Sequence, residues 1–283
     1  MATLPNPLPN LATDPSGRSL GLRLPPGRLI DATYDGRWHE PLLWHADKPA
    51  APGTWKALGA PAARAGLLPV LVDVGGHQEG PGNWELMPDR MSYPGDHDAE
   101  EVLAEYWEDG AEDELAEAAE EAQETELAEE VEPFGSEWPG LAPALTPTAA
   151  PDVRAAAVAD SLTDGTHTWF KEPHLALVPA RRSADIPAAI GWTGPLNYDN
   201  DVARLCAVLR SWEERFGIRV VALGFDTLTV SVAAPPATRA EAEAVAAEHF
   251  AFCPDTLTQN GSDALRAYAE ELIGEPAWSF WWD

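Results

Sequence analysis

The sequence predicts an α+β protein, and three patterns in its C-terminal third carry that prediction. Apolar side chains recur at the helical spacing of about 3.6 residues across 202–216. Residues 228–232 alternate apolar and polar side chains, which is typical of a strand with one buried face. Residues 238–241, Thr-Arg-Ala-Glu, have the spacing of a capping box at the start of a helix. Helices and strands therefore follow one another in this part of the chain.

The first part of the chain is expected to be a flexible lead followed by a small domain. Residues 1–19 are rich in Pro and Asn and have no regular apolar pattern. Residues 20–107 are predicted to form a smaller α/β N-terminal domain. It opens with a strand at 28–34 that ends in an Asp-Gly turn at 35–36, and 39–44 is its expected hairpin partner.

One loop and one strong strand complete this domain. Residues 47–61 are rich in Pro, Gly and Ala and are predicted to be a loop. The apolar run at 67–74 predicts a buried strand. Because a proline cannot donate a hydrogen bond to a sheet, Pro69 favours an edge strand or a strand that begins after it.

Acidic residues dominate the middle of the chain. The formal net charge is −29, and residues 91–153 hold twenty of the 47 Asp and Glu residues but no Lys or Arg. A capped helix is expected at 98–107, with an apolar stripe that docks on the N-terminal domain. Like charges repel at helical spacing, so 108–151 is predicted to be an acidic and then Pro-rich linker that forms a frayed helix at most. The alternative is an acidic arm that binds a basic partner or mimics the backbone of a nucleic acid.

Residues 152–283 are predicted to form a C-terminal α+β domain. In chain order, the expected elements are a helix at 152–162, a strand at 174–178, a helix at 200–216, strands at 218–224 and 228–232, helices at 238–250 and 262–272, and a strand at 278–282. Apart from the first helix and one extra helix, this is the βαββαβ order of a ferredoxin-like sandwich. Such a fold places an antiparallel sheet against a layer of helices and buries their apolar stripes.

Three ordered motifs in this domain resemble a known family. They are LRSWEERFG at 209–217, AEHFAFCPD at 247–255 together with Gln259, and the terminal WWD at 281–283. On these motifs the chain resembles the bacterial domain-of-unknown-function family 4253 across 174–283. The resemblance implies a boundary for the C-terminal domain and implies no activity.

His249, Cys253 and Asp255 form the candidate catalytic site. The first two are four residues apart, so they share a helix face if the helix continues to Cys253. A thiolate beside an imidazole and a carboxylate is the set used by cysteine nucleophiles, and the same residues suit one metal ion. Against both, a cysteine among apolar neighbours and a histidine on an apolar helix face usually pack in a core. No HExxH or CxxC motif is present, and we predict neither a metal nor a cofactor.

Four residues are the candidate partner-binding surface: Trp212, Arg215, Trp281 and Trp282. In the terminal strand, Trp281 points away from the face that Trp278 and Trp282 share. The last strand of a ferredoxin-like sheet lies at an edge, where an exposed tryptophan marks an interface. The alternative is that these aromatic residues belong to the core.

Composition limits the classes of partner and indicates a location. An acidic field repels nucleic acids and anionic membrane surfaces. No apolar run reaches the roughly 18 residues that a membrane-spanning helix needs, and no signal sequence is visible. The excess of Ala, of Pro and of Arg over Lys is typical of a GC-rich bacterial coding sequence. We therefore expect a cytoplasmic bacterial protein that binds neither nucleic acid nor membrane, and we predict no oligomeric state.

The leading functional hypothesis is a non-enzymatic protein that binds a basic protein partner, as immunity and antitoxin proteins bind basic toxins. The alternative is a small hydrolase or transferase that uses His249, Cys253 and Asp255. Loss of the Cys253 thiol would leave the first function intact and abolish the second. A third hypothesis treats 108–132 as an acidic linker between two structural modules.

Overall fold

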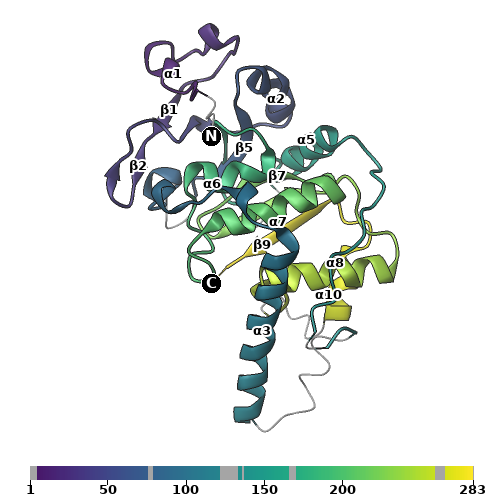
Figure 1. Ribbon diagram of the computed structural model, residues 1–283. Helices are drawn as coiled ribbons and strands as arrows, with labels where there is room; N and C mark the ends of the chain where they lie inside the picture. The colour runs from purple at the N-terminus through teal and green to yellow at the C-terminus, as the bar shows by residue number, and fades with distance from the viewer. Residues whose placement is uncertain are drawn as a thin grey trace.

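The structure of the protein is a computed structural model of the 283-residue chain. It describes residues 5–75, 79–121, 133–135, 137–165, 170–258 and 265–282. The predictions for 122–132, for Gln259, for the start of the helix at 262–272 and for Asp283 lie outside these residues. The described residues form one large sheet with helices on both of its faces (Figure 1).

Strands from both halves of the chain build the main sheet, which has seven strands. In spatial order they are β1 (Gly27–Ile30), β4 (Leu43–Pro49), β6 (Pro173–Val178), β5 (Leu68–Asp73), β7 (Arg219–Leu223), β8 (Thr227–Ser231) and β9 (Ala277–Trp281). A separate hairpin joins β2 (Ala32–Thr33) to β3 (Gly36–Arg37) near the predicted turn. Neighbours in the main sheet are antiparallel, except for the parallel pair β5 and β7. The mixed α+β class is therefore confirmed.

Helices cover both faces of the main sheet. The helices of the described residues are α1 (Asn10–Thr13), α2 (Thr54–Arg64), α3 (Ala99–Glu121), α5 (Pro151–Leu162), α6 (Ile186–Ile190), α7 (Val202–Arg215), α8 (Arg239–Phe252), α9 (Asp255–Thr258) and α10 (Leu265–Leu272). Short 3₁₀ helices lie at Arg18–Leu20, Pro81–Asn83, Pro88–Arg90, Pro94–Asp96 and Ser183–Asp185. Helices α2 and α5 cover one face, while α6, α7, α8 and α10 cover the other. Strand β5 contributes to both cores, with Leu71 on the first face and Val70 and Val72 on the second.

The two predicted domains share the main sheet. Strand β6, from the second half of the chain, lies between β4 and β5, from the first half. It pairs with β5 from Leu68↔Val178 to Asp73↔Pro173. The predicted boundary between 151 and 152 therefore does not divide the sheet, because residues on both sides of it complete the hydrogen bonding of β6.

The ferredoxin-like strand order is not confirmed. In a ferredoxin-like sandwich, the strands that flank the first helix are separated by another strand of the same motif. Here the strand between β6 and β7 is β5, from the first half of the chain, and β7, β8 and β9 lie side by side in antiparallel pairs, with α8, α9 and α10 in the connection between β8 and β9. The order of elements along the chain matches the prediction, whereas their pairing depends on a strand from outside the motif.

Both alternatives predicted from Pro69 are wrong, because β5 is an inner strand and begins at Leu68, before the proline. Pro69 pairs with Leu177 of β6, but β5 meets β7 on its other side only at Leu71 and Val72. The proline thus lies before the ladder with β7 begins, where its missing N–H leaves no gap in that ladder.

The loop predicted at 47–61 is wrong at both ends, because β4 continues to Pro49 and α2 begins at Thr54. Trp55, Leu58 and Ala62 lie on one face of this helix and are buried. The helix is rich in alanine, which has the highest helix propensity. Burial of the apolar face offsets the cost of Pro61 inside the helix, which is about 3 kcal/mol.

The predicted flexible lead contributes to the core instead of lying free in solvent. Leu8 and Leu11 are buried in one cluster with Trp44 of β4 and Leu177 of β6. Two leucines in a Pro-rich segment form no periodic pattern, so nothing local in the sequence indicates that they pack.

Candidate functional site

The three candidate catalytic residues lie at the C-terminal end of α8 and just beyond it. Helix α8 begins with the predicted capping box, in which the hydroxyl of Thr238 and the carboxylate of Glu241 each accept a hydrogen bond from the other residue's backbone N–H. His249 lies within the helix, Cys253 follows its last residue, and Asp255 opens α9. His249 is therefore held in the core by α8, whereas Cys253 and Asp255 lie where this helix ends and α9 begins.

His249 is a residue of α8 that is completely buried, and its ring packs against side chains of α7 and β9. The centroid of its ring lies 4.5 Å from that of Trp278 and 4.9 Å from that of Phe280. Its Nδ1 is 2.9 Å from the hydroxyl of Tyr268, while its Nε2 has no hydrogen-bond partner among the described residues. Burial lowers the pKa of His249 to about 3, so its imidazole is neutral at neutral pH.

Cys253 is buried as well, and its thiol donates a hydrogen bond to the backbone carbonyl of Trp281 at a distance of 3.0 Å. Burial, together with the nearby charge of Asp255, raises the pKa of Cys253 to about 12. Within the described ranges, no hydrogen bond joins the thiol of Cys253 to the imidazole of His249; the two residues are linked only through the backbone, where the N–H of Cys253 donates to the carbonyl of His249. The pair therefore lacks the arrangement of a nucleophile and its base, which activates a thiol by lowering its pKa.

Two of the predicted partner-binding residues bind a buried carboxylate inside the protein. The carboxylate of Glu248 accepts hydrogen bonds from Nη1 and Nη2 of Arg215, each at 2.6 Å, and from Nε1 of Trp212, at 2.7 Å. It accepts another from the backbone N–H of Ala142, and Arg215 donates to the carbonyl of that residue. This network joins α7 and α8 to the segment around Ala142. Trp212 and Arg215 therefore make internal contacts rather than forming a surface.

The two terminal tryptophans have different environments. Trp282 is 2 % exposed, and the centroid of its ring lies 5.7 Å from that of Trp192. Trp281 is half-buried and lies on the opposite face of the strand, as the alternation predicts. Strand β9 is an edge strand of the main sheet. Trp281 therefore remains a candidate for contact with a partner.

A cavity of about 300 Å³ lies against the face of β8 and β9 that carries Trp281, and we call it the edge pocket. It is lined by Val158, Leu162, Phe170, Thr227, Thr229, Asp255, Thr256, Glu275, Ala277, Ser279, Phe280 and Trp281. The end of α5, the start of α9 and the last strands of the sheet therefore all contribute walls. The volume lies at the lower end of the range for small-molecule sites, which is roughly 300–1,000 Å³.

Period-two alternation explains the polar floor of the edge pocket. On β8, Leu228 and Val230 enter the core, so Thr227 and Thr229 face the other way, into the pocket. On β9, Ser279 takes the equivalent position, and its hydroxyl lies 3.0 Å from that of Thr229. The sequence pattern of these strands therefore contained a signal for a polar face, although it gave no indication that a cavity covers that face.

Two carboxylates and one of the predicted aromatic residues meet in the edge pocket. Asp255 and Glu275 line it together with Trp281, and the lining contains no Lys or Arg among the residues that the structure describes. The structure thus brings together one predicted catalytic residue and one predicted partner-binding residue. Glu275 was not predicted, because it lies in the connection between α10 and β9, where no periodic pattern assigns it a face.

The acidic segment forms a helix that continues well past the predicted 98–107. The second half of α3 projects away from the body of the protein (Figure 1). Its first half is docked through four buried residues, Val102, Leu103, Tyr106 and Trp107. This stripe packs on α7 and α8, from the second half of the chain, whereas the sequence suggested docking on the N-terminal domain.

Docking of its first half explains how such an acidic helix can form. From 108 to 121 the sequence of the helix holds eight Asp and Glu residues and no Lys or Arg, so this stretch supplies no cation for an i,i+4 ion pair. In the docked half, the hydroxyl of Tyr106 donates to Asp199, and Arg204 lies 2.7 Å from Glu105 and 3.1 Å from Asp199. These contacts anchor the helix, and elongation from an anchored turn costs less than nucleation.

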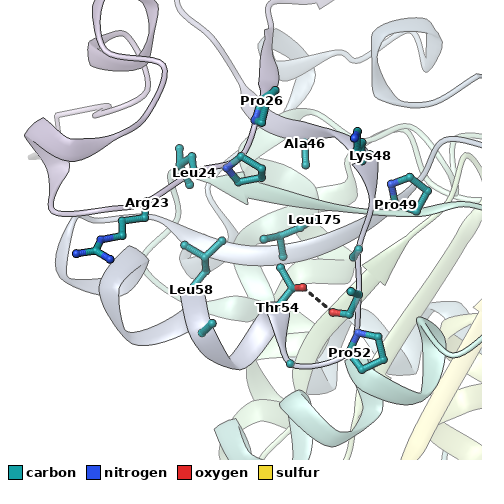
Figure 2. A pocket seen from close by; sticks show the side chains of 15 residues that line it. Arg23, Leu24, Pro26, Ala46, Lys48, Pro49, Pro52, Thr54, Leu58 and Leu175 are labelled. Atoms are coloured by element: carbon teal, nitrogen blue, oxygen red, sulfur yellow. Dashed lines mark hydrogen bonds between the residues drawn. The ribbon is translucent and has the colours of Figure 1, made fainter.

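A larger cavity, of about 780 Å³, lies between α2, β4 and the residues before β1 (Figure 2). Proline, alanine and leucine side chains make up most of its wall, with Arg23 and Lys48 as cationic residues. At its base the hydroxyl of Thr54 donates to the carbonyl of Ala51 at 2.6 Å, where α2 begins. No predicted site residue lines this cavity.

Neither a metal centre nor a membrane span is found in the described part of the chain. Over those residues, no group of three or more His, Cys, Asp or Glu side chains is placed to hold a metal ion. His249, Cys253 and Asp255 therefore form no ligand set in this arrangement. Over the same ranges, no helix is both long and apolar enough to cross a membrane.

These features define a mixed α+β protein with a projecting acidic helix and an acidic pocket at the edge of its sheet. Its residues 174–283 match the family model described as "Domain of unknown function (DUF4253)". The resemblance drawn from the three sequence motifs is thereby confirmed, and the match runs from β6 through β9. Comparisons with curated proteins and with solved structures each gave no match.

Proposed function

We propose that the protein is a non-enzymatic binding protein for a cationic protein partner, of the immunity or antitoxin kind, in the cytoplasm of a bacterium. The observation that carries the proposal is the position of α3. From 108 to 121 this helix holds eight Asp and Glu residues and no Lys or Arg, and its second half projects from the body of the protein (Figure 1). A projecting anionic helix favours fast, salt-sensitive association with a basic surface.

The use of arginine inside the protein supports the same proposal. Five arginines of the second half have carboxylate partners within the chain, and their side chains are 34 % exposed or less: Arg182, Arg204, Arg210, Arg215 and Arg219. Internal pairs occupy these cations, and the formal net charge of the whole chain is −29. A cationic partner would reduce the mutual repulsion of the carboxylates that give the chain this charge.

The alternative, a small hydrolase or transferase, finds less support in the geometry. Such an enzyme needs a thiol of lowered pKa next to an imidazole that accepts its proton. Burial raises the pKa of Cys253 and lowers that of His249, which is the opposite of both requirements. We therefore propose binding rather than catalysis.

The proposal is tested by affinity capture from an extract of the cells in which the protein is native, at low and at high salt. The α3 variant combines Glu112→Gln, Asp113→Asn and Glu114→Gln. A control variant removes the same charge from exposed positions elsewhere, through Asp35→Asn, Glu40→Gln and Asp89→Asn. We expect the wild type and the control to retain a basic protein that high salt releases, and the α3 variant to lose it. An empty capture, or equal capture by the two variants, contradicts the proposal.

A further inference from the structure

We infer that the edge pocket binds one organic cation, an ammonium or guanidinium group, as carried by a lysine or arginine side chain. That this cation belongs to a protein partner rests on the proposed function. That the ligand is a cation follows from the residues that line the pocket. A cavity of about 300 Å³ suits a single side chain better than a longer peptide.

Two carboxylates give the edge pocket its charge. Asp255 is half-buried at the first turn of α9, and Glu275 is exposed in the connection before β9. Over the described residues the lining contains no Lys, Arg or His, so its formal charge is negative. A cation that enters is attracted more strongly than in bulk water, because protein atoms replace part of the solvent around it. An anionic ligand would meet two carboxylates, and the described lining residues offer it no Lys, Arg or His.

Aromatic and aliphatic side chains form the rest of the wall. Trp281 is half-buried on the edge strand, and Phe170 lines the pocket with 6 % of its surface exposed. The face of a tryptophan attracts a cation within about 6 Å of its ring centroid. Val158 and Leu162 of α5 supply apolar surface for the methylene groups of a lysine or arginine. This combination favours an organic cation over a bare metal ion.

Hydroxyl groups supply acceptors for the hydrogen atoms of the cation. An ammonium group has three N–H donors and a guanidinium group has five, and neither has an acceptor. Thr227, Thr229 and Ser279 lie on the floor of the pocket, and each hydroxyl has acceptor capacity. Together with the two carboxylates, they can satisfy several donors of one bound group.

The inference is tested with small probes in the absence of any partner. The probes are Nα-acetyl-lysine amide, Nα-acetyl-arginine amide and, as a neutral match for the second, Nα-acetyl-citrulline amide. Titration calorimetry measures affinity, and the ¹⁵N signal of the Trp281 indole reports the place of binding. We expect saturable binding of at least one cationic probe, at least tenfold tighter than citrulline, with a shift of the Trp281 signal. No saturable binding, or equal binding of arginine and citrulline probes, overturns the inference.

Substitutions then locate the site. Glu275→Lys places a cation at an exposed position of the lining, where a substitution should not disturb folding. It is expected to lower the affinity for the cationic probe at least tenfold. Asp255→Asn and Trp281→Ala are also expected to lower this affinity. Glu40→Lys, the same charge change at an exposed position outside the pocket, is expected to leave affinity unchanged. Unchanged affinity in Glu275→Lys overturns the inference.

The probe assay and the capture assay test the two proposals separately. The α3 variant is expected to bind the cationic probes as the wild type does, because it leaves the lining of the edge pocket intact. Probe binding with an empty capture contradicts the proposed function and leaves this inference standing. Capture that depends on α3 while no cationic probe binds contradicts this inference alone.

Discussion

The guanidinium of Arg215 makes two hydrogen bonds of 2.6 Å to the carboxylate of Glu248, which is completely buried. The backbone N–H of Ala142 and the indole N–H of Trp212 donate to the same carboxylate. A buried ion pair offsets its desolvation only when its hydrogen bonds are well satisfied, as they are here. The pair therefore fixes α7 to α8, and both to the segment around Ala142.

Removal of the charge on Glu248 is expected to destabilise the protein strongly. Glu248→Gln leaves the mostly buried guanidinium of Arg215 without its counter-charge, and breaking such a pair costs about 3 kcal/mol or more. Urea unfolding measures the change in the free energy of unfolding. Asp47→Asn is the matched control, because its partner Arg28 is 64 % exposed and surface pairs contribute about 1 kcal/mol at most. Equal effects of the two substitutions would show that the buried network does not hold the helices together.

His249 is expected to make stability depend on pH. Its pKa is about 3 in the folded protein against an ordinary 6.5, so below pH 6.5 protons bind the unfolded chain preferentially. This contribution to stability is complete above pH 6.5 and is lost as the pH falls toward 3. When the pH falls from 7.5 to 5.5, the free energy of unfolding of the wild type should decrease by about 1.4 kcal/mol more than that of His249→Gln, as urea unfolding at the two pH values will measure.

The control for this measurement is His39→Gln, which removes an exposed histidine. It is expected to keep the pH dependence of the wild type. If His249→Gln and the wild type lose stability in parallel between the two pH values, the imidazole of His249 is not held neutral by burial.

Both cysteines are expected to be inert in the folded protein. Burial raises the pKa of the Cys253 thiol to about 12 and also raises that of Cys206. At pH 8, an alkylating reagent should modify neither thiol until denaturant is added. Mass spectrometry of the intact chain measures the extent of modification. Cys253→Ala is expected to fold and to capture the same partner as the wild type. Rapid labelling of native Cys253, with loss of function on substitution, would support the hydrolase or transferase hypothesis.

The shared sheet predicts that the C-terminal half does not fold by itself. In a fragment of residues 152–283, strand β6 would lose β4 and β5, its neighbours on both sides. Unpaired backbone groups and the exposed faces of Leu175 and Leu177 should leave this fragment without a cooperative transition. Thermal unfolding followed by circular dichroism, with the full chain as reference, measures this. A sharp transition in the fragment would mean that 152–283 is an independent domain.

Local patterns predicted the parts of the fold that local interactions determine. The capping box at Thr238 and Glu241 depends on residues three apart and is found as expected. The alternation in β9 placed Trp278 and Trp282 in the core and Trp281 on the other face. The insertion of β5 between β6 and β7 could not be predicted in this way, because β5 pairs with strands that lie about 100 and about 150 residues further along the chain.

The candidate site was predictable only in part for the same reason. Asp255 and Trp281 stood out in the sequence, but the edge pocket also needs Phe170 and Glu275 from connections that carry no periodic signal. Glu248 lies within the motif at 247–255, where a carboxylate on the apolar face of a helix is the signal for a buried partner. That signal becomes specific only when the fold brings Arg215 beside it.

The central claim, that α3 recruits a cationic partner, is tested most directly by association kinetics with the captured protein. The association rate constant is measured for the wild type and the α3 variant between about 50 and 500 mM salt. We predict that the wild type associates roughly tenfold faster or more at low salt, that the two rates converge at high salt, and that dissociation changes little. Equal association rates at low salt, or unaltered binding after deletion of 108–132, would contradict the claim and leave the segment as a linker.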